Sequence, residues 1–212
     1  MQSRVMKSSH KNILPLLLTA ILIFLTGCKN EDPNPENIPE MITKVILKFS
    51  PTGGGSLVTV TATDPDGGGV QDIQVDGTID LLKNSDYILS LELINELYLP
   101  GDVDYDITEA VKQEGEEHQF FFSFTEGVFS SPTGTGNIKD NASSVAGSII
   151  YLDKDINNLP IGISTLWTTA AIAASTKSFR IILKHQPDIK SDNSTSLDGE
   201  SDLDLSFELN VN

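Results

Sequence analysis

Alternation of apolar and polar residues at every second position most constrains the fold of this chain. The pattern is clearest near the C-terminus, between residues 202 and 211. The residues of one parity are Leu203, Leu205, Phe207, Leu209 and Val211, and those of the other are Asp202, Asp204, Ser206 and Glu208. Since successive side chains of a β-strand point to opposite faces, we expect a strand with the first set buried and the second in water.

Further segments of this kind are rich in β-branched and aromatic residues and are separated by turn residues. We expect strands over residues 43–49, 57–63, 87–94, 117–124, 145–152, 163–169 and 177–185. Phe120, Phe122 and Phe124 share one face, and an exposed face this apolar would aggregate, so we assign it to the core. Trp167, the only tryptophan, is also expected in the core rather than as a platform for a sugar.

One short helix is predicted among the strands. Asp106 and Glu109 have the spacing of a capping box, and Gly115 stands where a helix commonly ends. Some eight strands with one helix predict an all-β fold, a single antiparallel β-sandwich of the immunoglobulin-like kind. This domain is expected to span residues 41–212, which is an ordinary domain size.

Residues 1–27 have the features of a signal peptide. Three basic residues precede an apolar run of 13 residues, Ile13–Leu25. A helix needs roughly 20 apolar residues to cross a bilayer, so the run is too short for an anchor helix. The residues just before Cys28, the only cysteine, are Leu25, Thr26 and Gly27.

This arrangement resembles the lipobox of bacterial lipoproteins. The resemblance implies that diacylglycerol is transferred to the sulfur of Cys28 and that the chain is cleaved before Cys28, which would anchor it stably in a membrane. The alternative is an ordinary secretory leader with an incidental cysteine. Lys29–Asp32 resembles the lysine-plus-acids signal of lipoproteins that reach the surface of Gram-negative cells. The expected location is therefore the outer membrane, facing the exterior.

Residues 28–40 contain three prolines and few apolar groups, so we expect an extended tether of roughly 35 Å. Removal of residues 1–27 leaves 11 basic and 30 acidic residues, a net charge near −19. Such a charge repels nucleic acid, and we expect no nucleic-acid partner.

Four short motifs occur in a fixed order along the mature chain. They are Thr63–Gly67, Asp106–Glu109, Glu117–Phe122 (with the sequence His-Gln-Phe-Phe-Phe at its end) and His185–Asp188 (His-Gln-Pro-Asp). Together they resemble a group of small Gram-negative lipoproteins of undescribed role, often labelled as a type 1 periplasmic binding fold superfamily. That label implies two α/β lobes, whereas these residues predict one short helix. From the resemblance we therefore expect that the chain belongs to this group of lipoproteins. We do not take from it an expectation that the protein binds a solute.

An aspartate-rich turn is the first candidate site. Asp64, Asp66 and Asp72 surround a glycine-rich stretch, and calcium prefers several hard oxygen ligands of this kind. A plain turn explains the same residues, because proline and glycine suit its backbone angles. Calcium is thus a possible cofactor here, and the acidic loop 188–202 is a weaker candidate.

The second candidate site is a histidine pair. His118 begins one predicted strand and His185 ends another. Each histidine has the same parity as the core-facing residues of its own strand. If the two strands are antiparallel neighbours, both imidazoles reach the same end of the sandwich, near Glu116 and Asp188. Two imidazoles with a carboxylate suit zinc or copper. Histidines that bond to loop carbonyls are the alternative.

The sequence contains no motif that nominates a catalytic nucleophile or a phosphate-binding loop, so an enzyme is not expected. We expect an outer-membrane or cell-surface lipoprotein that is held to the membrane by its lipid. Its sandwich would act as a binding or scaffold module for an envelope protein or a glycan. The alternative is a metal-handling envelope protein, for calcium or for zinc or copper, or an accessory hydrolase.

Overall fold

The computed structural model describes residues 40–67, 72–139 and 147–212. The chain divides into two units, Met1–Glu36 and Asn37–Asn212. The first unit, with the predicted signal peptide, the lipobox and Cys28, lies outside the described residues. Within the described ranges, no helix has the length and apolar character that crossing a bilayer requires.

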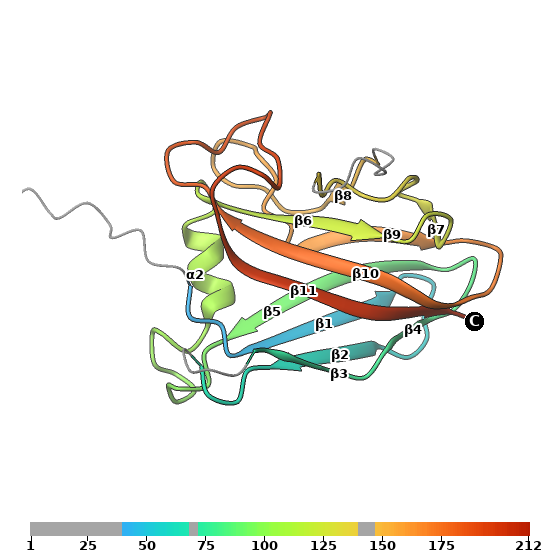
Figure 1. Ribbon diagram of the computed structural model, residues 1–212, viewed down its shortest axis with the longest axis horizontal. Coiled ribbons are helices and arrows are strands. Elements are labelled where there is room, and N and C mark those ends of the chain that lie inside the picture. The colour runs from blue at the N-terminus through green and yellow to red at the C-terminus, as the bar shows by residue number, and fades with distance from the viewer. Residues whose placement is uncertain (1–39, 68–71, 140–146) are drawn as a thin grey trace, which may run out of the picture. The chain divides into compact units, whose positions relative to one another are not determined.

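Two β-sheets pack face to face to form a sandwich (Figure 1). The larger sheet has the strand order β3-β2-β1-β5-β9-β7, with β8 paired to β9. Its strands are β1 (Lys44–Pro51), β2 (Val58–Thr63), β3 (Gln74–Asp76), β5 (Asp86–Ile94), β7 (Phe129–Ser131), β8 (Ile150–Tyr151) and β9 (Ser164–Thr169). The smaller sheet has the order β4-β11-β10-β6, formed by β4 (Ile79–Leu81), β11 (Glu200–Val211), β10 (Ala174–His185) and β6 (His118–Phe124).

The all-β sandwich predicted from the sequence is confirmed, but two parts of the prediction need comment. The strand order does not confirm an immunoglobulin-like topology. The sandwich is also not wholly antiparallel, since β4 pairs with β11 in parallel, with Ile79 opposite Leu209. The chain passes from β3 in the larger sheet to β4 in the smaller sheet at Gly77, whose φ is 88°. This change of sheet sets the direction in which β4 meets β11.

Most of the predicted strands are present, and the differences lie in short segments. The strand expected over 145–152 is limited to Ile150–Tyr151, with residues 145 and 146 outside the described part of the chain. The strands β3, β4 and β7 were not predicted. Each has three residues, which is too short for a period of two to be recognised.

Aromatic side chains from both sheets form the centre of the core. Trp167 on β9 is fully buried, with ring centroids 4.8 Å from Phe129 and 5.1 Å from Phe179. Its indole nitrogen donates to the Thr165 hydroxyl at 2.7 Å. The core position predicted for Trp167 is confirmed, as is that of Phe122, which packs on Trp167 at 5.5 Å.

The helix α2 (Ile107–Gln113) lies across one end of the sandwich, between β5 and β6 (Figure 1). The Asp106 carboxylate accepts the backbone N–H of Glu109 at 3.2 Å, which confirms the predicted N-cap. The Thr108 hydroxyl bonds both to the N–H and to the carbonyl of Leu93, so it fixes the helix to the end of β5. We call this the α2 end. Here β5 and β10 end, and β6 and β11 begin.

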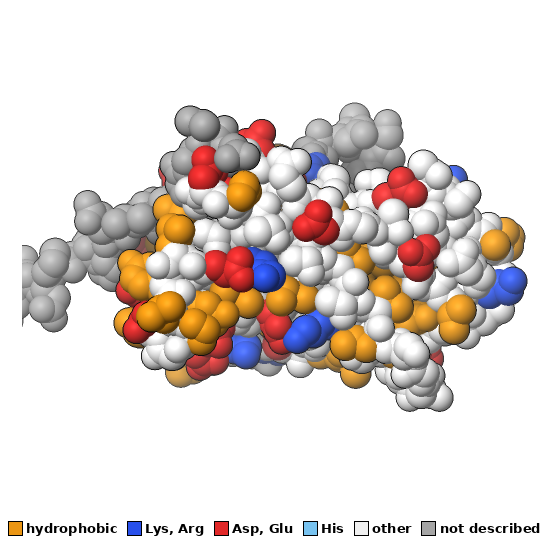
Figure 2. Space-filling model, turned by 90° about the horizontal axis from the view of Figure 1, so that it is seen from below, with side chains coloured by type: hydrophobic (Ala, Val, Ile, Leu, Met, Phe, Trp, Pro, Cys, Tyr) orange, Lys and Arg blue, Asp and Glu red, His pale blue; other side chains and the backbone are white. Residues whose placement is uncertain are grey.

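The surface seen in Figure 2 carries scattered acidic and basic side chains among apolar ones. The ion pairs include Lys44 with Glu96 at 2.8 Å and Arg180 with Asp204 at 2.7 Å, all on partly exposed side chains. Exposed pairs of this kind contribute little to stability. Most of the Asp and Glu residues that the structure describes are exposed to water.

Candidate metal centre at the α2 end

The sandwich brings the two predicted histidines face to face. Strands β6 and β10 are antiparallel neighbours, and His118 lies directly opposite His185 in their register. The two imidazole rings are stacked, with centroids 4.7 Å apart and planes 4° from parallel. The expectation that both histidines reach the same end of the sandwich is therefore correct.

The hydrogen bonding of His118 defines its tautomer. His118 is fully buried, and its Nδ1 lies 3.1 Å from the carbonyl oxygen of Glu114. Because a carbonyl only accepts, Nδ1 must carry a hydrogen. In the neutral ring, Nε2 then has a free lone pair, the state in which a histidine binds a metal ion.

Asp202 supplies the carboxylate that faces this nitrogen. The Asp202 side chain is fully buried, and its Oδ2 lies 3.4 Å from Nε2 of His118. Among the described residues, neither carboxylate oxygen of Asp202 nor Nε2 of His118 has a hydrogen-bond partner. A buried carboxylate without donors is unfavourable, so this arrangement calls for a cation or a proton between the two groups.

A break in the register of β11 explains why Asp202 points inward. Leu203 lies opposite Leu183, but the next pair along is Ser201 with Lys184, so Asp202 has no residue opposite it. A bulge of this kind turns one side chain away from the face that strict alternation gives it. The outward orientation predicted for Asp202 is wrong for this reason, and the sequence has no signal for the bulge.

The other carboxylates around the pair also differ from expectation. His185 contacts Glu117 rather than Glu116 or Asp188, with 3.2 Å between Nε2 and Oε2. The Glu116 carboxylate instead accepts a hydrogen bond from Asn157 at 2.9 Å. Asp188 occupies a turn with a positive φ of 61°. Because the carboxylates near the pair come from several elements, their identity was not readable from local sequence.

The electrostatics of the centre follow from its burial and its acidic groups. Burial lowers the pKa of His118, but contact with Asp202, the Glu114 carbonyl and the charge of Glu40 outweigh this effect, so that the pKa is raised overall. Burial raises the pKa of Glu40, as do Glu114 and Asp202, whereas the two histidines lower it. The centre therefore favours positive charge at its middle.

The separation of His118 from Asp202 fits a small divalent cation. One potential ligand atom from each of His118, His185 and Asp202 lies within 4.8 Å of the others. Zinc binds histidine nitrogen and carboxylate oxygen at about 2.0–2.2 Å, so two ligands of a tetrahedral ion are about 3.4 Å apart. The separation of His118 Nε2 from Asp202 Oδ2 is 3.4 Å. Because a metal cannot lie in the planes of two stacked rings, the His185 ring must rotate to bind the same ion.

The aspartate-rich turn shows a different arrangement. The backbone N–H of Asp66 donates to the Asp64 carboxylate at 3.1 Å, as in an Asx turn. Asp72 follows residues 68–71, which lie outside the described part of the chain. Within the described ranges, both groups of three potential ligands contain His118, and neither includes an aspartate of this turn. Calcium at the turn stays a prediction.

The acidic loop that follows β10 uses one of its carboxylates within a local turn. Asp198 accepts hydrogen bonds from the backbone N–H and the hydroxyl of Thr195, both at 2.8 Å. These bonds lower the pKa of Asp198. The carboxylate therefore has a structural role in closing the loop.

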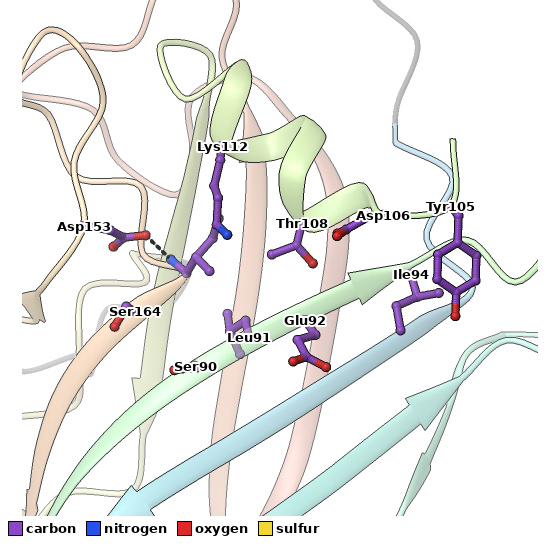
Figure 3. Close-up of a pocket in the computed structure, with 11 residues that line it drawn as sticks. Ser90, Leu91, Glu92, Ile94, Tyr105, Asp106, Thr108, Lys112, Asp153 and Ser164 are labelled. Carbon is purple, nitrogen blue, oxygen red and sulfur yellow. Dashed lines mark hydrogen bonds between the residues drawn. The ribbon is translucent and has the colours of Figure 1, made fainter. Parts of the chain in front are cut away.

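A cleft of about 580 Å³ lies beside α2 (Figure 3). Several of its polar groups are already engaged in the fold. Asp153 accepts the backbone N–H groups of Gly162 at 3.0 Å and Ile163 at 2.9 Å, and burial raises its pKa. Thr108 and Asp106, which also line the cleft, hold the helix as described above. Among the described residues, the buried unpaired atoms that face one another are those of His118 and Asp202 at the histidine pair.

Comparison with known proteins gave no match to a family model, to a curated protein or to a solved structure. The resemblance to small Gram-negative lipoproteins therefore stays a prediction.

Proposed function

We propose that this chain is a lipid-anchored protein of the outer membrane whose β-sandwich binds a divalent transition-metal ion, with zinc as the best match. The ligands are His118, His185 and Asp202. One observation carries the proposal: the fully buried Asp202 carboxylate lies 3.4 Å from Nε2 of His118, and neither group has a hydrogen-bond partner among the described residues. This supports the metal-handling function over a scaffold or hydrolase function, for which the described residues offer no comparable feature.

The anchoring part of the proposal is supported by sequence alone. Lipidation of Cys28 would hold the sandwich at the membrane, and residues 29–40 would separate the two. The net charge near −19 would attract metal cations to the domain without binding anionic lipids. Replacement of Cys28 by serine should move the protein from the membrane fraction to the soluble fraction. Retention of the variant in the membrane fraction would contradict the proposed anchor.

Metal binding is tested on the lipidated protein, purified in detergent and freed of metal with a chelator. Titration calorimetry should show one zinc ion bound per chain. Asp202→Asn keeps the size of the side chain but removes its charge, and it should weaken zinc binding at least tenfold. Glu208→Gln removes one charge from an exposed residue of the same strand and should leave the affinity unchanged. Equal affinities for Asp202→Asn and the unaltered protein would refute the site.

A further inference from the structure

Glu40 lies next to the metal centre, although it precedes the first strand of the other sheet. One ligand atom each from Glu40, Glu114 and His118 lie within 4.8 Å of one another. The carboxylate of Glu40 also interacts electrostatically with Asp202 and His185. His118 thus belongs both to this group and to the group with His185 and Asp202, so Glu40 lies at the edge of the proposed metal site.

Glu40 lies at the point where the chain enters the domain, so a contact made by Glu40 bears on how that entry segment is held. Glu40 is followed within a few residues by Thr43, whose N–H and hydroxyl both donate to the Ile94 carbonyl at the end of β5 in the larger sheet. His118 and Asp202 belong to the smaller sheet, on β6 and β11. A metal ion held by all three residues would join the point at which the chain enters the domain to the opposite sheet (Figure 1).

Charge and coordination number both support a fourth ligand. Two neutral imidazoles and two carboxylates balance the two positive charges of zinc and complete four-coordinate geometry. Zinc sites with four protein ligands are closed and structural, whereas catalytic sites keep one position for water. The Glu114 carboxylate is less suited, because Glu114 is exposed and its backbone carbonyl already orients His118.

We infer that Glu40 is the fourth ligand, so that metal binding fastens the entry of the chain to the smaller sheet and acts as a metal-dependent latch. This inference rests on the proposed metal site. It adds a regulatory consequence, since metal occupancy then gives a second attachment, to the smaller sheet, to the segment that Thr43 already joins to Ile94. Glu40 is partly buried, and a cation at the site would offset the repulsion of its carboxylate by Glu114 and Asp202.

The test combines zinc titration with hydrogen exchange on the lipidated protein in detergent. Addition of zinc should slow exchange of the backbone amides of residues 41–43 at least tenfold. Glu40→Gln should weaken zinc binding at least tenfold and abolish this added protection. The control is Glu96→Gln, which removes a partly exposed carboxylate that pairs with Lys44 near the same segment. It should retain both zinc affinity and zinc-dependent protection.

The outcomes separate the two proposals. Absence of zinc binding to the unaltered protein refutes the metal site and the latch together. Zinc binding that depends on Asp202 but is unchanged in Glu40→Gln refutes the latch and leaves the metal site standing. Unchanged exchange at residues 41–43 on zinc addition also refutes the latch. Loss of both affinity and protection in Glu40→Gln, with neither lost in Glu96→Gln, supports it.

Discussion

Replacement of Tyr151 by phenylalanine should destabilise the sandwich by an amount that depends on pH. The Tyr151 hydroxyl donates to the Phe120 carbonyl at 2.8 Å and accepts from the Asn137 side-chain amide at 2.8 Å. Each bond contributes about 0.5–1.5 kcal/mol net, so their loss should lower the free energy of unfolding by about 1–3 kcal/mol near pH 8.

The pH dependence follows from the buried hydroxyl. Burial raises the pKa of Tyr151 from the ordinary value of 10 to about 12, against a smaller opposing effect of its hydrogen bonds. Between these values the unfolded chain has lost the phenolic proton while the folded chain retains it, so the stability from this group falls as pH rises. At pH 11 this loss amounts to about 1.4 kcal/mol in the unaltered protein. The phenylalanine variant has no such proton to lose.

The measurement is urea unfolding of both proteins at pH 8 and at pH 11, followed by circular dichroism. The difference in stability between them should shrink by about 1.4 kcal/mol on going to pH 11, while the titration of all other groups cancels. Tyr98→Phe is the control, because the Tyr98 side chain is 43% exposed, and it should change stability at pH 8 by less than about 0.5 kcal/mol. A difference that stays constant from pH 8 to pH 11 would refute the reasoning.

Two further substitutions test the packing around the α2 end. Lys190→Met removes the partner of Asp155 in an ion pair of 2.8 Å whose side chains are both 1% exposed, and it should destabilise by about 3–5 kcal/mol in urea unfolding. Adding Asp155→Asn should recover part of this loss, and no recovery would contradict the pairing. Gly199→Ala places a Cβ 2.1 Å from the His185 carbonyl at a φ of 74°, and should destabilise by more than about 1 kcal/mol and weaken zinc binding. Gly53→Ala, with nothing within 4 Å, should change neither, and equal effects of the two alanines would contradict the close contact.

The amino-acid sequence by itself determined the fold class and the approximate place of the longer strands. Alternation over residues 202–211 places Leu203 and Phe207 in the core, because a side-chain period of two is a local property of extended backbone. The parity of His118 and His185 predicted that both reach one end of the sandwich only if their strands were antiparallel neighbours, and the structure supplied that pairing. The N-cap at Asp106 is equally local, because it depends on a residue three positions away.

Only the tertiary structure decided which other groups share the centre with these histidines. Asp202 turns inward because β11 meets β10 with a register shift at that position, and a shift between strands leaves no mark in either sequence. Glu40 joins the centre from the far end of the chain, and the parallel pairing of β4 arises where the chain changes sheet. Such contacts between residues distant in sequence depend on how the two sheets pack. Local periodicity therefore defines the strands, and packing defines the site.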